Sequence, residues 1–184
     1  MILPMSVWRH IRPIILLPFM ATVVVPGLIV WTDGIVFHQY GLIFSPQAGW
    51  VFRGAGIIAL CLGLALFVGT VRAFAMIGKG TLGPWDPPQR LVIAGAYRHC
   101  RHPMISGVTF VLIGEALVTA SPPLLVWLSF FLMANMLYLP LVEEPQLVRR
   151  FGAEYEEYRR HVPPIWPDPI PWAPDSKEQH DEPT

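Results

Sequence analysis

The chain has 184 residues and no net charge; 53% of its residues are hydrophobic and only 14% are charged. Soluble domains carry about 25% charged residues, so this composition is typical of a membrane protein. Because no basic surface is implied, nucleic acid is excluded as an expected partner. The length suits a single domain, which we expect to cover residues 1–162.

Long uncharged stretches predict the membrane-spanning helices. Residues 13–32 and 54–71 contain no charged side chain. The 40 residues from 103 to 142 contain a single charged side chain, that of Glu115. A helix needs roughly 20 apolar residues to cross the bilayer core, so the last stretch is long enough for two spans. The fold class expected is therefore an all-α integral membrane protein with four transmembrane helices, at about 11–32, 51–74, 103–120 and 123–142.

The distribution of Lys and Arg predicts the orientation of these spans. Basic residues precede the first span, follow the fourth, and lie between the second and the third. The 33–50 loop contains no Lys or Arg, and neither does the short turn between the last two spans. The positive-inside rule then places both termini and the loop between the second and third spans in the cytoplasm.

That cytoplasmic loop is expected to be structured and to end at a binding site. Residues 78–96 contain four glycines and three prolines, and the sequence YRHCRHP follows at 97–103. Pro103 suits the first turn of a helix, where a missing N–H costs nothing. His102 then lies near the N-cap, where free backbone N–H groups and the positive helix end favour a bound carboxylate or phosphate.

After the fourth span, the sequence predicts a cytoplasmic amphipathic helix at about 144–161. Leu147, Phe151, Tyr155 and Tyr158 are spaced by four, four and three residues, which places them on one helix face. Seven prolines in residues 163–184 predict a poorly ordered C-terminal tail.

The last two spans form a hairpin, so the start of one and the end of the other must be neighbours. This places Glu143 and Glu144 close to Arg101 and His102. Such a group is either a ligand site or a set of salt bridges that clasps the hairpin at the membrane surface, and spacing alone leaves both interpretations open.

Two segments of the sequence carry a family resemblance. The segment GAYRHCRHPMISG, then a hairpin, then EEPQLVRRFGAEYEEYRRHVPPIWP resembles the integral-membrane methyltransferases of the isoprenylcysteine carboxyl methyltransferase and phospholipid N-methyltransferase superfamily. The resemblance covers roughly residues 75–167 and includes a loop similar to that of bacterial members. It implies an S-adenosyl-L-methionine site without a Rossmann fold, at the cytoplasmic face of a bacterial inner membrane.

The resemblance also implies which residues form the site. The expected cofactor-binding residues are the turn, the RHP core, the acidic pair and two tyrosines of the closing helix: Gly95, Tyr97, Arg101, His102, Pro103, Glu143, Glu144, Tyr155 and Tyr158. Arg101, His102 and Glu144 are the expected catalytic residues. Arg101 or the N–H groups that open the third span suit the cofactor carboxylate, and a glutamate suits its ammonium or ribose. Methyl transfer needs no metal, and His102 or Glu144 is available to accept a proton from a neutral acceptor.

Two further residues bear on the acceptor. Ile105 stands where family members commonly have tyrosine, which changes one wall of the pocket. Glu115 lies about 18 Å along the third span, near mid-membrane, where ionisable residues are functional candidates. It either lines a substrate tunnel or is a packing glutamate that pairs with Asn135.

The function expected is methyl transfer to a lipophilic acceptor that reaches the site from the lipid bilayer: a carboxylate, a lipid amine or a thiol. The alternative is a non-catalytic lipid-binding or assembly subunit that retains the fold, for which Ile105 is the sequence support. A transporter fragment is weaker, since four spans without broken helices leave little room for a pathway.

Overall fold

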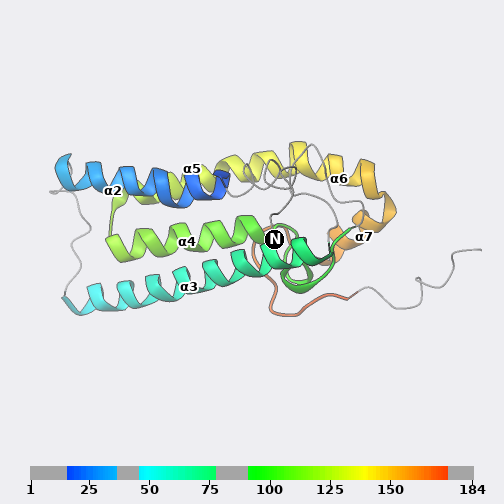
Figure 1. The fold of residues 1–184 in the computed structure, drawn as a ribbon, viewed down its shortest axis with the longest axis horizontal. Coiled ribbons are helices and arrows are strands. Elements are labelled where there is room, and N and C mark those ends of the chain that lie inside the picture. The colour runs from blue at the N-terminus through cyan, green and yellow to red at the C-terminus, as the bar shows by residue number, and fades with distance from the viewer. Residues whose placement is uncertain (1–15, 37–45, 78–90, 174–184) are drawn as a thin grey trace, which may run out of the picture.

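The structure is a computed structural model that describes residues 16–36, 46–77 and 91–173, and these residues contain helices and turns but no strand. Parts of the predicted first span, of the loop at 78–96 and of the tail lie outside the described residues. The long helices run side by side, and α6 and α7 lie together at one end (Figure 1). The long helices are α2 (Val25–Val36), α3 (Pro46–Ile77), α4 (Pro103–Thr119) and α5 (Pro122–Tyr138), and the shorter elements are η1 (Met20–Val24), η2 (Gly95–Arg98), η3 (Leu139–Glu143), α6 (Glu144–Phe151) and α7 (Ala153–His161).

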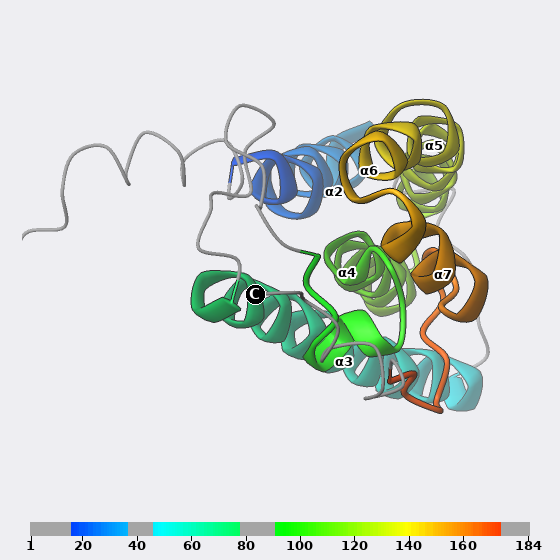
Figure 2. The ribbon, with the colours of Figure 1, turned by 90° about the vertical axis from the view of Figure 1, so that its right-hand side faces the viewer.

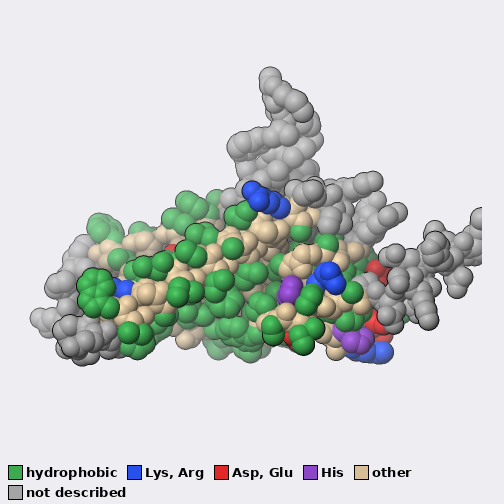
Figure 3. Space-filling model, turned by 90° about the horizontal axis from the view of Figure 1, so that it is seen from below, with side chains coloured by type: hydrophobic (Ala, Val, Ile, Leu, Met, Phe, Trp, Pro, Cys, Tyr) green, Lys and Arg blue, Asp and Glu red, His purple; other side chains and the backbone are tan. Residues whose placement is uncertain are grey.

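Two of the helical segments are long and apolar enough to cross a membrane, Gly49–Ala73 and Pro122–Phe151. Only 17% and 6% of their most apolar windows are buried inside the protein, so their apolar surface faces outward, unlike that of a soluble core helix. Hydrophobic side chains accordingly occur along the whole helical part of the face in Figure 3, while the His side chains and most of the visible charged ones lie toward one end. The shorter apolar helices, Leu16–Thr32 and Pro103–Thr119, coincide with the other two predicted spans, and their crossing of the membrane stays a prediction.

Helix α4 lies at the centre of the bundle, between α3 on one side and α2 and α5 on the other (Figure 2). Glycines allow α3 and α4 to approach closely. A Cβ atom on Gly63 would lie 2.7 Å from the carbonyl oxygen of Gly107, and one on Gly114 would lie 2.7 Å from that of Gly56. The two helix backbones are therefore in direct contact, as small residues permit in membranes.

Prolines in the first helix disturb its hydrogen bonds. The N–H of Val25 bonds to the carbonyl of Met20, five residues back, which makes η1 a π-helical turn. Pro26 has no N–H for the carbonyl of Ala21, and the indole Nε1 of Trp127 on α5 donates to that oxygen at 3.0 Å. A neighbouring helix thus satisfies the carbonyl that proline leaves free.

The predicted separate helix at 144–161 has different boundaries in the structure. Helix α5 continues without a break through the π-helical turn η3 into α6, and the N–H of Glu144 bonds to the carbonyl of Leu139. The π-turn suits Pro140 and Pro145, which cannot donate to the regular helical ladder. The helix ends instead at Gly152, whose φ of 56° and ψ of −131° favour glycine, and α7 begins after it.

The prediction of a poorly ordered tail is wrong for residues 163–173. This segment folds back along the 98–106 region and is fixed there by hydrogen bonds. The N–H groups of Arg101 and His102 donate to the carbonyls of Pro163 and Pro164 at 2.8 and 3.0 Å. Proline content indicated disorder, but proline carbonyls remain good acceptors and the rigid ring lowers the entropic cost of ordering the segment.

Candidate functional site

The charged residues of the predicted hairpin contact meet as expected. Arg101 and His102 immediately precede α4, and Glu143 and Glu144 lie where η3 passes into α6. Nη1 of Arg101 lies 2.5 Å from Oε1 of Glu144, and both side chains are only 9% exposed. Nδ1 of His102 lies 3.3 Å from Oε1 of Glu143. The π-turn places both glutamates on the side of the helix that faces the start of α4.

A second arginine joins this cluster from α7. Nη1 of Arg159 lies 3.5 Å from Oε2 of Glu144, and the Arg159 side chain is about half exposed. The sequence pattern does not indicate Arg159, because a single helix through residues 144–161 gives no reason to bring it to Glu144. The break at Gly152 was the available signal, since glycine is a common helix terminator.

Several buried polar atoms of the cluster have no hydrogen-bond partner among the described residues. They are Nε and Nη1 of Arg101, Nε2 of His102 and the hydroxyl of Tyr155. Nη1 of Arg101 forms an ion pair with Glu144, Nε2 of His102 is 3.9 Å from Oε1 of Glu144, and the Tyr155 hydroxyl interacts with Arg101, but none of these contacts has the geometry of a full hydrogen bond. Buried polar groups without partners are rare and costly, so this arrangement is suited to a polar ligand.

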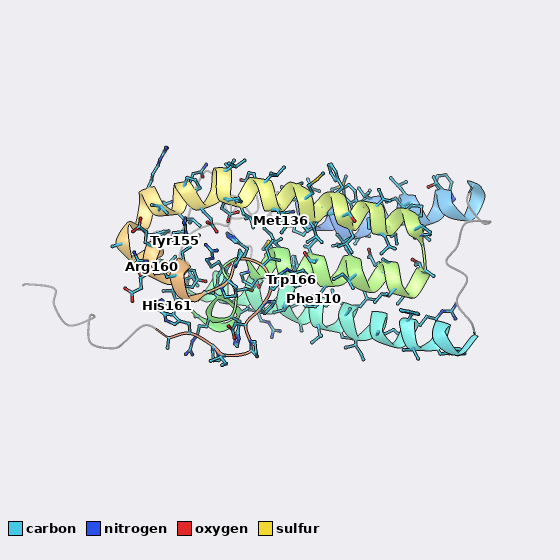
Figure 4. The ribbon with its side chains drawn as sticks, turned by 180° about the vertical axis from the view of Figure 1, so that it is seen from behind. Phe110, Met136, Tyr155, Arg160, His161 and Trp166 are labelled. Carbon is cyan, nitrogen blue, oxygen red and sulfur yellow. The ribbon has the colours of Figure 1, made fainter. Side chains whose placement is uncertain are left out.

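The tyrosines of α7 form the apolar wall beside these atoms. Tyr155, Tyr158 and Val162 are buried in one cluster, against which Leu147, Phe151 and Trp172 pack. The hydroxyl of Tyr158 donates to the backbone carbonyl of Tyr97 at 2.5 Å. Burial, together with the nearby charge of Glu144, raises the pKa of Tyr155 to about 12, so this phenol stays protonated. Figure 4 shows Tyr155, Arg160 and His161 together at the α7 end of the molecule.

The environment of His102 favours its charged form. Burial alone lowers the pKa of this imidazole, but interaction with the carboxylates of Glu143 and Glu144 outweighs it, so the pKa is raised above its ordinary value of 6.5. The charge of Arg101 opposes this effect without reversing it. His102 is therefore poised to hold a proton near neutral pH.

The other predicted residues lie around the cluster or away from it. Pro103 is buried in the first turn of α4, and Gly95 has a φ of 58° in the exposed turn before Tyr97. Ile105 is half-buried on α4, and Glu115 lies three turns further along the same helix. Oε2 of Glu115 has no partner among the described residues, while Asn135 donates to the carbonyl of Phe131.

The N–H groups of Arg101 and His102, which precede α4, donate to the carbonyls of Pro163 and Pro164. The prediction concerns the N–H groups inside the first turn of α4, and it stays a prediction. The buried side-chain atoms of Arg101, His102 and Tyr155 are further available donors.

The phospholipid methyltransferase family model matches residues 52–154, more than half of the chain and including the RHP turn and both glutamates. The chain belongs to the phospholipid methyltransferase family. The match confirms the resemblance read from the sequence and makes the chain a membrane methyltransferase in general terms. No curated protein matches the chain. No solved structure matches it either.

Proposed function

We propose that this family member transfers a methyl group from S-adenosyl-L-methionine to a lipophilic acceptor, at the cytoplasmic face of a bacterial inner membrane. The observation that carries the proposal is the set of buried, unpartnered donors on Arg101, His102 and Tyr155 beside the carboxylate of Glu144. A salt-bridged clasp explains the pairing of Arg101 with Glu144, but it gives no reason to leave three buried side chains with unused hydrogen-bonding atoms.

The donor set fits this cofactor. S-adenosyl-L-methionine presents a carboxylate, an ammonium, a sulfonium and ribose hydroxyls. Nε of Arg101 and the hydroxyl of Tyr155 would hold the carboxylate, since both are buried and unpartnered donors. Glu144 and Glu143 would accept from the ammonium or the ribose hydroxyls, because charge-assisted hydrogen bonds to a carboxylate are the strongest available here.

The residues of the chain supply alignment, water exclusion and proton transfer. When bound, S-adenosyl-L-methionine supplies an activated methyl carbon, so the protein needs no further electrophile. The buried tyrosines of α7 exclude water from the site, and the paired charges of Arg101 and Glu144 hold its polar groups in fixed positions. In its neutral form, which grows as the pH rises past its raised pKa, His102 would accept a proton from a neutral acceptor such as an amine or thiol, and Glu143 at 3.3 Å would stabilise the imidazolium that results.

The acceptor would reach this site from the bilayer. The cluster lies at the ends of α4 and of the apolar helix α5, whose exposed face carries Val126, Phe130 and Met133. A lipid amine, a lipophilic carboxylate and a lipophilic thiol all suit such a location. The alternative of a non-catalytic subunit is not favoured, because its support is Ile105 alone, whereas the RHP turn and the acidic pair are intact and in contact.

Calorimetric titration of the purified chain in nanodiscs with S-adenosylhomocysteine tests the proposal. We expect a dissociation constant on the order of 1 μM for the wild type. Glu144→Gln and Arg101→Ala should each weaken binding roughly thirtyfold or more, because removal of one buried charged partner costs about 2–5 kcal/mol. Glu154→Gln and Arg160→Ala are the matched controls, since both side chains are exposed on α7.

The unfolding midpoint of each variant, measured in the same nanodiscs, separates loss of binding from loss of folding. Glu143→Gln should disturb folding less than the other two site variants, because the Glu143 side chain is 37% exposed. A well-folded wild-type protein that does not bind S-adenosylhomocysteine would overturn the proposal. Binding that survives in all three site variants would place the cofactor elsewhere.

A further inference from the structure

Residues 163–172, which we name the strap, run beside α4 away from its N-terminus and then turn back toward residues 98–99. Successive strap residues contact positions progressively further along the chain toward and into α4. These contacts are Pro163 with Arg101, Pro164 with His102, Ile165 with Ser106 and Trp166 with Phe110. The return is fixed by the N–H groups of Asp168 and Trp172, which donate to the carbonyls of His99 and Arg98 at 2.9 Å each.

The point of the strap furthest from the start of α4 lies beside the middle of that helix. The ring of Trp166 meets the ring of Phe110 edge to face, with centroids 6.2 Å apart (Figure 4). Phe110 is seven residues past Pro103, about 10 Å along a helix axis. Side chains on a helix lean toward its N-terminus, so the Phe110 ring and Trp166 beside it lie less than this distance past the start of α4. A span that begins at Pro103 would therefore place Trp166 close to the boundary between headgroups and acyl chains.

The backbone of the strap is suited to a place with little water. Five of its ten residues are prolines, which have no N–H to satisfy. Carbonyls of Pro163, Pro164 and Ile165 accept hydrogen bonds from the RHP turn and from the hydroxyl of Ser106. Irregular backbone at membrane depth is tolerated where protein groups satisfy it in this way.

The large exposed side chains of the strap are apolar, and its one charged side chain, the exposed Asp168, accepts a hydrogen bond from the N–H of Ile170 at 2.8 Å. Trp166 is 54% exposed and Ile170 is 77% exposed, although both are large hydrophobic residues. Trp172, in contrast, is stacked on His161 with centroids 5.2 Å apart and packs against the buried cluster of α7. Tryptophan is enriched at membrane interfaces because its ring is apolar and its N–H is polar.

We propose that the strap is inserted into the phospholipid leaflet beside α4, with Trp166 at the boundary of headgroups and acyl chains and Ile170 in contact with lipid. The inference rests on α4 crossing the bilayer, which is part of the proposed function. The strap thereby fixes the depth of Arg101 and His102, whose backbone N–H groups it binds, relative to the lipid surface from which an acceptor arrives.

Tryptophan emission in nanodiscs of phosphatidylcholine, with and without bromine on the upper acyl chain, tests the insertion. The wild type is compared with Trp166→Phe, Trp50→Phe and Trp172→Phe. The emission of Trp166 is the difference between the wild type and Trp166→Phe, and the emission of Trp50 is obtained in the same way. Bromine should quench the same fraction of both, because Trp50 is an exposed tryptophan at the end of the candidate span Gly49–Ala73. The emission assigned to Trp172 should be little quenched, because that ring is packed against protein.

The outcomes distinguish this inference from the proposed function. Quenching of Trp50 without quenching of Trp166 would overturn the insertion of the strap, whatever the result of the S-adenosylhomocysteine titration. Quenching of neither would contradict the membrane placement on which both proposals depend. Quenching of Trp166 in a protein that does not bind S-adenosylhomocysteine would uphold the strap and overturn the methyl transfer.

Discussion

At the residue scale, Glu144 joins three parts of the chain. Its two carboxylate oxygens meet Arg101 from the turn before α4 and Arg159 from α7, and it is itself nearly buried. A buried charge is tolerable only when it is paired, so the burial of Glu144 depends on Arg101 being in place beside it. This is the physical reason why a site of long side chains can be rigid enough to align a reaction.

His102 should make the stability of the protein depend on pH. Its pKa is raised in the folded protein, so its contribution to stability is complete below the ordinary value of 6.5 and is lost as the pH rises through the raised folded value. We expect the difference in unfolding midpoint between wild type and His102→Gln to be largest near about pH 6 and to shrink toward about pH 9. Thermal unfolding in nanodiscs over this range measures it. A difference that is constant or grows with pH would contradict the assignment.

The sequence predicted the central part of this site and missed its edges. A hairpin forces its two ends together, so the contact of Arg101 with Glu144 followed from span lengths alone and is confirmed. Arg159 was missed because its position depends on the direction in which the chain leaves Gly152, and a backbone direction after a break is not encoded in helical periodicity. The unpartnered state of Tyr155 is likewise a property of packing in three dimensions.

At the element scale, spacing patterns located the helices but not their irregular turns. The predicted spans at 103–120 and 123–142 are close to α4 and to α5 with η3. Hydrophobic spacing does not predict the two π-turns, although each lies close to a pair of prolines. The strap was misjudged because composition reports the entropy of a free segment and not the hydrogen bonds that a folded neighbour offers.

The contact between α3 and α4 should depend on single glycines. A Cβ atom on Gly63 would lie 2.7 Å from backbone atoms of α4, and neither backbone can give way without separating the helices. We expect Gly63→Ala to lower the free energy of unfolding by about 1–3 kcal/mol, as overpacking does. Gly69→Ala on the same helix is the matched control, because nothing lies within 4 Å of its added Cβ.

Chemical denaturation in mixed micelles measures both variants. Gly69→Ala should be neutral or stabilising by up to about 1 kcal/mol, since alanine favours the helix over glycine. Equal destabilisation by the two substitutions would show that helix propensity, and not contact between the backbones, decides the outcome.

At the scale of the whole molecule, the packing favours four spans over two. Helix α4 has 17 residues, at the short end of the range that crosses a bilayer. It packs against α3 both at Gly56 with Gly114 and at Gly63 with Gly107, so it shares the depth of a helix that is itself long enough to span. With four spans, the loops without Lys and Arg would lie on one side of the membrane and the basic segments on the other.

Cysteine labelling in intact cells tests this topology. In a Cys61→Ala background, an impermeant maleimide should label Gln39→Cys and Thr119→Cys from outside, and should label Ser176→Cys only after lysis. Thr119 is exposed at the end of α4. Positions 39 and 176 lie outside the described residues, and their side of the membrane is predicted from the sequence. If only α3 and the helix that begins at Pro122 crossed the membrane, Thr119→Cys would be protected and Ser176→Cys would be labelled in intact cells. That result would place α4 on the cytoplasmic side and remove the route by which a lipid-borne acceptor reaches Arg101, His102 and Glu144.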